Sequence, residues 1–417
     1  MPNYLDIFAG AGGLSEGFMQ AGFRPIAHIE MDKAACYTLK TRLAYKWLYE
    51  HRQTNIYNRY LNNQITRQDL YDTIPEQLLN SVLNYEISEE NLEEIFQKID
   101  NILAGRNLDL IVGGPPCQAY SLVGRARDEN KMIGDKRNYL YLLYARFLQK
   151  YQPRYFVFEN VTGLLSAKDI DGVLYFDKMR QLFEEHGYSV EYRKLNAKDY
   201  GVLQNRPRII LIGKHGRYEG FYPEIPKEEN VYLVGEIFKD LPKIKAGKGI
   251  YGPINTLHYD GKYLFEAGIK EKDLEIITFH CARQNKEQDL KIYKKAVMLW
   301  DRDKKRLSYI NLPKKLRSQN NTKSFLDRFK VVASNLPYSQ TVVAHISKDG
   351  HYFIHPDKKQ NRSLTPREVA RLQTFPDNYY FESVSGRPSR TDAFKQIGNA
   401  VPVLLSRKIA TALLEVW

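Results

Sequence analysis

Residues 109–121 read Asp-Leu-Ile-Val-Gly-Gly-Pro-Pro-Cys-Gln-Ala-Tyr-Ser. The run from Leu108 to Val112 is apolar and contains β-branched residues, and two glycines follow it. This pattern predicts a buried strand that ends at a glycine turn. Two prolines then restrict the backbone dihedrals and remove two amide donors, so the turn is stiff and cannot join a sheet. We therefore expect Cys117 at the carboxyl edge of a strand, where open α/β sheets bind their ligands.

A second glycine-rich turn lies near the N-terminus. Residues 4–8 are predicted to form a strand, and Ala9-Gly10-Ala11-Gly12-Gly13-Leu14-Ser15 follows it. Glycines in such a turn let the backbone approach a ligand, while the first amides of the next helix point toward it. Ser15 stands where a dinucleotide-binding loop has its third glycine, which disfavours an NAD site. The next apolar run, residues 25–29, ends in Glu30, where an acidic group can bind the hydroxyls of a ribose.

Ionisable side chains also accompany two later predicted strands. Residues 154–158 are aromatic and β-branched and lead into Glu159, whose carboxylate would face the same ligand-binding edge. Arg206 and Arg208 adjoin an apolar run at 209–213, and side chains two residues apart on an extended backbone point the same way. Their guanidinium groups are therefore expected to converge and to hold an anionic or carbonyl-bearing substrate. Taken singly, each residue has a structural alternative: a buried thiol, a solvent-facing acid or surface arginines.

The composition limits the class of protein. The 417 residues suffice for two domains, and the three cysteines, Cys36, Cys117 and Cys281, are too widely spaced for a disulfide framework or a zinc site. Neither a signal peptide nor a membrane-spanning apolar run is recognisable, so we expect a soluble protein of the reducing cytoplasm. The net charge is +13, and residues 301–330 contain ten Lys or Arg against three Asp. Such a cluster is typical of a solvated surface or of a site for nucleic acid.

The segments between these motifs are less regular. Residues 41–106 are polar and are interpreted as an insertion without chemistry of its own; within it, residues 88–103 have helical apolar spacing, and a third strand is expected near Asp69. From about 216 to 360 the scattered prolines, glycines and charges indicate a second domain. Thr365-Pro366-Arg367-Glu368 is a capping box that starts a short helix. An amphipathic helix ends the chain, with one face formed by Leu405, Ile409, Ala412, Leu413 and Val416.

Taken in order, the motifs resemble those of bacterial-type cytosine-5 DNA methyltransferases, which use S-adenosylmethionine. Each motif is moderately specific, but the ordered set spans nearly the whole chain. The motifs are Asp6-Ile7-Phe8-Ala9-Gly10-Ala11-Gly12-Gly13, Glu30-Met31-Asp32, Gly114-Pro115-Pro116-Cys117-Gln118, Glu159-Asn160-Val161, Gln204-Asn205-Arg206-Pro207-Arg208, Leu364-Thr365-Pro366-Arg367-Glu368 and Gln396-Ile397-Gly398-Asn399-Ala400-Val401-Pro402.

The resemblance implies an α/β fold: a Rossmann-like methyltransferase sheet, mostly parallel with helices on both faces, and a second, smaller target-recognition domain. The catalytic domain would comprise residues 1–218 and be completed by 392–417. Residues 219–391 would form the target-recognition domain and hinge, and the two lobes would clamp a duplex. The cofactor would be S-adenosylmethionine, with no metal, and its pocket is expected to contain Phe8, Gly10, Gly12, Gly13, Glu30, Met31, Pro116, Leu140, Asn399 and Val401.

The chemistry of the family explains these residue types. The target cytosine must be flipped out of the duplex, because its reacting atoms are hidden in the stack. The Cys117 thiolate would add to carbon 6, so that carbon 5 can attack the methyl group. Glu159 would donate to ring nitrogen 3, while Arg206 and Arg208 would hold the base carbonyl and help to keep the thiolate form available. Gln118 and Ser121 are expected to contact DNA.

Two alternatives share the motifs or the fold. A tRNA cytosine-5 methyltransferase has the same set, but the long basic region after Arg208 favours double-stranded DNA, because the RNA branch has a reduced one. A catalytically silent DNA-binding regulator would lack Cys117, Glu159 or the arginine pair, and all are present. For the favoured enzyme we expect a monomer that modifies specific DNA sequences in the cytoplasm, with a restriction endonuclease as a candidate functional partner.

Overall fold

The computed structural model describes residues 1–116, 136–229, 231–271, 276–317 and 325–417. Its centre is a seven-stranded sheet in the order β3-β2-β1-β4-β5-β7-β6. Neighbouring strands are parallel except for the two pairs made by β7, which confirms the predicted mostly parallel α/β sheet. The strands are β1 (Asn3–Ile7), β2 (Arg24–Glu30), β3 (Val82–Asn84), β4 (Leu110–Gly113), β5 (Tyr155–Asn160), β6 (Tyr188–Asn196) and β7 (Pro207–His215).

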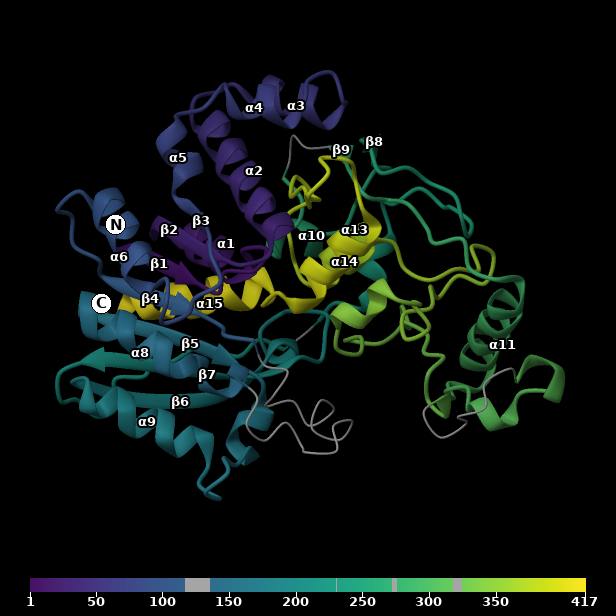
Figure 1. Cartoon of the computed structure of the whole chain (residues 1–417). Helices are drawn as coiled ribbons and strands as arrows, with labels where there is room; N and C mark the ends of the chain where they lie inside the picture. Colours follow the sequence, from purple (N-terminus) through teal and green to yellow (C-terminus); the bar gives the residue numbers. More distant parts are fainter. Residues whose placement is uncertain (117–135, 230, 272–275, 318–324) are drawn as a thin grey trace.

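Helices cover both faces of this sheet (Figure 1). Side chains of β1 alternate between the two cores: Tyr4 packs in the cluster that contains α1 and α15, whereas Leu5 and Ile7 pack in the cluster that contains α6, α8 and α9. Burial on both faces explains why the central strands are almost continuously apolar rather than alternating. These helices are α1 (Gly13–Gln20), α6 (Leu92–Leu103), α8 (Leu140–Tyr151), α9 (Tyr175–Glu185) and α15 (Val403–Glu415).

The C-terminal helix α15 lies against α1 and completes the core beside the first strands (Figure 1). Leu405, Ile409 and Leu413 are fully buried, so truncating one of them to alanine would cost about 2–5 kcal/mol. Val416, predicted on the same face, is instead 40% exposed, because the helix ends one residue earlier. Within the described residues, Arg390–Glu415 is long and apolar enough to cross a membrane, but 72% of its most apolar stretch is buried inside the fold. This stretch therefore serves as core.

The insertion is helical where a strand was expected. Asp69 lies in the first turn of α4, and its carboxylate accepts from the amide of Thr66 while the Thr66 hydroxyl accepts from the amide of Asp69. This capping box starts a helix and prevents an extended conformation there. The third strand is β3, thirteen residues later than the predicted position at Asp69, and it has only three residues. The helices are α2 (Lys33–Glu50), α3 (Thr54–Leu61), α4 (Arg67–Tyr71) and α5 (Glu76–Asn80).

The predicted helix within residues 88–103 is confirmed as α6. It begins at Leu92 rather than at Ser88, and all five of its predicted apolar positions are buried. They are Leu92, Ile95, Phe96, Ile99 and Leu103.

The region that follows β7 has little regular structure and lies beside the sheet, with α11 farthest from it (Figure 1). The basic cluster begins at the end of α11; Lys304, Lys305 and Arg306 are exposed, as are Lys314 and Lys315. The capping box of Thr365 and Glu368 is present as predicted and starts α13. The elements are β8 (Ile254–Asn255), α10 (Tyr263–Glu266), β9 (Ile276–Ile277), α11 (Glu287–Asp303), α13 (Pro366–Leu372) and α14 (Arg390–Asn399).

Short 3-10 helices connect several of these elements. They are η1 (Lys136–Tyr139), η2 (Thr162–Ser166), η3 (Ala197–Asp199), η4 (Val234–Phe238), η5 (Tyr309–Asn311), η6 (Lys314–Leu316) and η7 (Ala344–Ser347). Because η7 packs against α14, it brings the region after β7 next to the C-terminal motif.

Candidate active site

The predicted nucleophile follows directly on the last described residue of its turn. Strand β4 ends at Gly113, as expected, and the turn continues through Gly114 and Pro115 to Pro116. Cys117, Gln118 and Ser121 lie outside the described residues, so their predicted roles stay predictions. The structure does show which residues surround the base of this turn, up to Pro116.

Glu159 lies against the base of this turn. It lies on β5, which pairs with β4, and a Cβ added at Gly114 would be only 2.6 Å from Glu159 Oε2. A side chain at position 114 would therefore have to displace the carboxylate. The neighbouring Asn160 side chain donates to the Pro115 carbonyl at 3.3 Å and ties the same strand to the proline turn. The carboxylate thus lies against the turn at Gly114, which is three residues before Cys117 in the sequence.

Arg208 holds the other side of the Glu159 carboxylate. Its Nε lies 2.6 Å from Glu159 Oε1, and both side chains are only about a tenth exposed, at 11% and 13%. They come from the antiparallel strands β5 and β7, in which Glu159 pairs with Ile210. A guanidinium in this position fixes the orientation of the carboxylate. The structure therefore brings together two of the four predicted catalytic residues.

Arg206 has different neighbours from Arg208. Its side chain is 1% exposed and donates to the carbonyls of Val342, at 2.5 Å, and Gly398, at 3.1 Å. These carbonyls belong to the region after β7 and to the C-terminal motif. Whereas Arg208 contacts Glu159, Arg206 ties two distant segments together. The described contacts of the two arginines thus differ, and the convergence of their guanidinium groups on one substrate group stays a prediction.

The glycine turn after β1 has the geometry expected of a ligand cradle. Phe8, Gly10 and Gly12 all have positive φ angles, of 58°, 55° and 78°. A non-glycine residue in this conformation is strained, and such strain concentrates at functional sites. A Cβ added at Gly10 would meet no atom within 4 Å, so the space above it is open. The turn thus offers a backbone surface to a ligand at the carboxyl end of the central strand.

Glu30 closes this turn from the end of β2. Its two carboxylate oxygens accept hydrogen bonds from the amides of Gly10 and Asp32, each at 2.7 Å. Burial raises the pKa of Glu30, and these amide bonds oppose the rise. Met31, the next residue, is 57% exposed although it is apolar. An oriented acid beside an exposed apolar side chain suits a ribose that carries an adenine base.

The C-terminal motif returns to this turn, as expected. A Cβ on Gly13 would lie 2.5 Å from the carbonyl oxygen of Val401, so glycine is needed for the two segments to touch. Asn399 is exposed at the end of α14. The same helix carries Lys395, whose Nζ lies 2.5 Å from the carboxylate of Asp32. Pro116 and Leu140, the remaining predicted cofactor residues, are partly buried where the β4 turn ends and α8 begins.

The sequence assigns no role to three further residues at this edge. Asn84, at the end of β3, donates to the carbonyls of Glu30 and Met31, both at 3.0 Å. Asp32 caps α2 through the amides of Ala34 and Ala35. Tyr379 donates to the carbonyl of Ala11 within the glycine turn. A strand of three residues gives no periodic signal, and Tyr379 acts from a loop; only Asp32, an N-cap residue before a helix, had a readable signal.

The two described cysteines are unsuited to nucleophilic chemistry. Burial raises the pKa of the Cys36 thiol to about 12, and its Sγ donates to the Glu30 carbonyl at 3.2 Å. Burial also raises the pKa of the Cys281 thiol to about 11. Because the thiolate is the reactive form, neither thiol reacts readily near neutral pH. Among the described residues, no group of three or more His, Cys, Asp or Glu side chains is arranged to hold a metal ion.

A hollow of about 1060 Å³ lies elsewhere, between α2, α4 and the loop before α14. Tyr37, Tyr60 and Arg67 are among its lining residues. Of the predicted cofactor and catalytic residues that the structure describes, none lines this hollow, so it is separate from the sheet edge described above.

Comparison with known proteins agrees with this geometry. The family description "C-5 cytosine-specific DNA methylase" matches residues 3–74 and 77–415. The Type II methyltransferase M.Bpa9945I of Bacillus paralicheniformis is 38% identical, across 99% of this chain and 98% of its own length. M.DdeI of Desulfomicrobium norvegicum, also a Type II methyltransferase, is 30% identical across 98% of this chain and 87% of its own length.

A solved structure shares the fold. It is described as a DNA modification methyltransferase encoded within a prophage (E. coli), with a TM-score of 0.64 and 22% identity, and the match covers 100% of this chain and 99% of that one. Because the family description matches nearly the whole chain, this protein belongs to the C-5 cytosine-specific DNA methylases and is a DNA (cytosine-5-)-methyltransferase.

Proposed function

We propose that this enzyme transfers a methyl group from S-adenosylmethionine to carbon 5 of a cytosine that is flipped out of double-stranded DNA, with Cys117 as the nucleophile. The observation that carries the proposal is the position of Glu159. Its carboxylate is held between Arg208 and Gly114, at the base of the turn that bears Cys117. A nucleophile and an oriented acid on neighbouring strand ends are what addition to a pyrimidine ring requires.

The residues around the glycine turn fit S-adenosylmethionine. Glu30 is oriented by two amides for the ribose hydroxyls, and Met31 offers exposed apolar surface for the adenine. Asp6, at the end of β1, has a buried Oδ2 without a hydrogen-bond partner among the described residues. Burial and the nearby Glu30 raise the pKa of Asp6. A positively charged cofactor would favour the ionised forms of Asp6 and Glu30. S-adenosylmethionine is such a cofactor, and it supplies an activated methyl group when bound.

The chain's own residues would then act on the base in order. The Cys117 thiolate adds to carbon 6, and the electron pair of the ring double bond moves toward carbon 5, which takes the methyl group. Glu159 donates a proton to ring nitrogen 3 and so neutralises the negative charge that the thiolate brings to the ring, while Arg208 holds the carboxyl group in place. Removal of the proton from carbon 5 restores the double bond and expels the thiolate. The other two cysteines are buried with raised pKa values, which leaves Cys117 as the thiol for this step.

The biological setting follows from relatives and charge. Two relatives that align over nearly the whole chain are Type II methyltransferases, which supports sequence-specific modification together with a restriction endonuclease. The exposed basic residues after α11 suit contacts with DNA phosphates. We further propose that residues 219–391 form the target-recognition domain, that residues 392–417 complete the catalytic domain, and that the enzyme is a cytoplasmic monomer.

Nucleoside mass spectrometry tests this function. The purified protein is incubated with S-adenosylmethionine and either unmethylated DNA or unmodified tRNA, and each product is digested to nucleosides. We expect 5-methyldeoxycytidine in the DNA, and none from a Cys117→Ala variant that still binds S-adenosylmethionine. 5-Methylcytidine in the tRNA alone would move the function to RNA. Absence of both products, with cofactor binding intact, would favour a silent DNA-binding regulator.

A further inference from the structure

Tyr379 lies outside the predicted site, yet its hydroxyl contacts the glycine turn directly. The hydroxyl donates to the Ala11 carbonyl at 2.6 Å, and the side chain is 1% exposed. Tyr379 belongs to the loop between α13 and α14, 368 residues from Ala11 along the chain. This tertiary hydrogen bond therefore links the C-terminal part of the chain to the proposed cofactor turn.

The geometry of the turn explains what the hydrogen bond from Tyr379 does: it orients one peptide of the turn. Ala11 stands between Gly10 and Gly12, which both have positive φ angles, so the local backbone has little intrinsic preference for one orientation of the peptide between Ala11 and Gly12. That peptide is held at both ends: the Gly12 amide donates to the Ala9 carbonyl at 3.0 Å, and the Ala11 carbonyl accepts from Tyr379. Because a Cβ on Gly12 would lie 2.9 Å from the tyrosine oxygen, glycine is what lets the hydroxyl approach.

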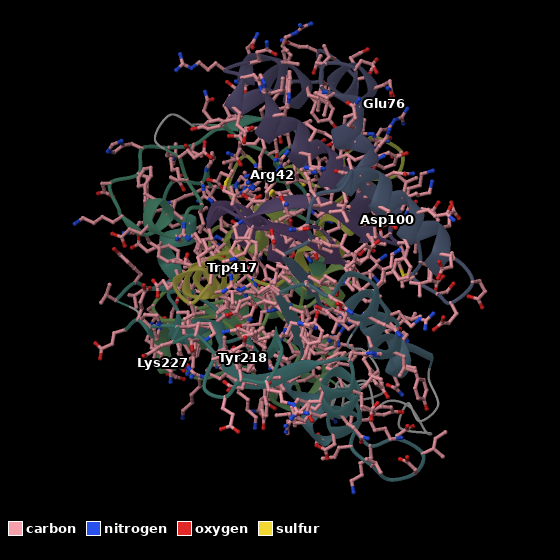
Figure 2. The ribbon with its side chains drawn as sticks, turned by 90° about the vertical axis from the view of Figure 1, so that its left-hand side faces the viewer. Arg42, Glu76, Asp100, Tyr218, Lys227 and Trp417 are labelled. Carbon is pink, nitrogen blue, oxygen red and sulfur yellow. The ribbon has the colours of Figure 1, made fainter. Side chains whose placement is uncertain are left out.

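Tyr379 is itself firmly placed. The guanidinium of Arg42 lies 4.9 Å from the centre of its ring and pairs with Glu16 on α1 at 2.7 Å. Figure 2 labels Arg42 in the interior of the fold, and its side chain is only 6% exposed. The carbonyl of Tyr379 accepts from buried Arg367 on α13 at 2.8 Å. The ring and the main chain of the tyrosine are thus each held by a buried arginine before any ligand binds.

The loop that carries Tyr379 is also bound to the region after β7. Asp377 pairs with Arg371 at 2.6 Å, and Arg371 pairs with Asp240 at 2.5 Å. The amide of Asp377 donates to the Ile269 carbonyl at 2.7 Å. A rigid, hydrogen-bonded path therefore connects this region, through two residues of the loop, to the glycine turn.

We propose that Tyr379 is a positioning residue for the cofactor: its hydroxyl fixes the peptide between Ala11 and Gly12 and so pre-forms the turn that binds S-adenosylmethionine. The inference rests on the proposed function, because it takes this turn as the cofactor site. Without the hydroxyl, the turn samples other orientations, and binding must select the competent one. The apparent affinity then falls in proportion to the fraction of competent molecules.

The test compares Tyr379→Phe with Tyr57→Phe. The Tyr57 hydroxyl is also buried and donates to a main-chain carbonyl of the same loop, that of Asn378, at 2.8 Å, but it does not contact the glycine turn. Each variant loses one buried hydrogen bond of the same kind, so both should show a similar decrease in Tm. Equilibrium dialysis with labelled S-adenosylmethionine gives the Kd, and steady-state methylation at saturating cofactor gives kcat.

We expect the Kd for S-adenosylmethionine to rise roughly 5- to 10-fold in Tyr379→Phe and to stay within about 2-fold of wild type in Tyr57→Phe. The kcat of Tyr379→Phe at saturating cofactor should remain within about 2-fold of wild type, because the turn is correctly formed once the site is filled. An unchanged Kd in Tyr379→Phe, or an equal rise in both variants, would overturn the inference while leaving the proposed function intact. Wild-type protein that fails to bind S-adenosylmethionine would refute the proposed function and, with it, this inference.

Discussion

Replacing Gly114 by alanine perturbs the site through one distance. The added Cβ would lie 2.6 Å from Glu159 Oε2, whereas ordinary contact begins at 3.4 Å, so the two atoms must separate by 3.4 − 2.6 = 0.8 Å. Gly114 is not among the residues with positive φ, so alanine is not strained by its backbone conformation. The displacement therefore falls on the carboxylate and on its 2.6 Å contact with Arg208. A misplacement of about 1 Å at a reacting centre can cost on the order of 100-fold in rate.

The assay for Gly114→Ala is transfer of a labelled methyl group to DNA under saturating S-adenosylmethionine. We expect kcat to fall about 100-fold, with the Kd for the cofactor and the Tm close to wild type. Gly252→Ala is the matched control, because a Cβ there has its nearest neighbour at 3.9 Å. A Gly114→Ala enzyme with wild-type kcat would refute the role of Glu159 at this turn. A rise in the Kd for S-adenosylmethionine without a fall in kcat would show that the substitution disturbs the cofactor site instead of Glu159, and would also contradict the prediction.

Three further predictions concern other groups of the site and its support. Arg206→Met should reduce the free energy of unfolding by on the order of 3 kcal/mol, measured by urea denaturation, because the carbonyls of Val342 and Gly398 lose a buried donor. Glu30→Ala should raise the Kd for S-adenosylmethionine at least about 10-fold in equilibrium dialysis, with little change in DNA affinity measured by fluorescence anisotropy. Burial would raise the pKa of Glu16, but Arg42 lowers it to about 2 from its ordinary value of 4.5. The ionised Glu16 therefore stabilises the fold above about pH 4.5, and this contribution is lost as the pH falls toward 2. Denaturation at several pH values should show a smaller loss between pH 5 and 3 in Glu16→Gln than in wild type, whereas exposed Glu76→Gln, at the periphery in Figure 2, should behave as wild type does.

The parts of the fold that could be read from sequence have a strong local signal. The apolar runs of β1, β2, β4 and β5 are recognisable because each is buried on both faces and ends at glycine or at a polar motif. The capping box of Thr365 works in the same local way. By contrast, β3 has only three residues, and the antiparallel strand β6 carries exposed charged side chains in its centre, so neither gives a clear pattern.

Arg206 shows why the candidate site could be predicted only in part. Side chains two apart on an extended strand share a face, but β7 begins at Pro207, so Arg206 precedes the regular strand. Its amide is bound by the Asn196 side chain, and its guanidinium meets carbonyls 136 and 192 residues away. Those partners are set by tertiary packing, which the spacing of residues does not encode. The same limit applies to Tyr379, whose contact spans 368 residues.

The glycine turn lies between these two cases. Its glycines and the acid at the end of β2 could be read from sequence, because each serves a local backbone requirement. The need for glycine at position 13 has a different cause, since a Cβ there would touch the Val401 carbonyl. From the sequence, only the resemblance to a family indicated that the glycine turn and the C-terminal motif lie next to each other.

The most direct test of the central claim is a covalent trap. DNA is synthesised with 5-fluorodeoxycytidine in place of every deoxycytidine, so that the recognition sequence need not be known in advance. Fluorine at carbon 5 cannot leave as a proton does, so the thiol adduct should persist after methyl transfer. We predict a protein–DNA adduct that resists denaturation and forms only when S-adenosylmethionine is present. After digestion with nuclease and protease, the modified base should be found on the peptide that contains Cys117. Attachment at Cys36 or Cys281, or methylation of ordinary DNA without any trapped adduct on the fluorinated substrate, would contradict the account.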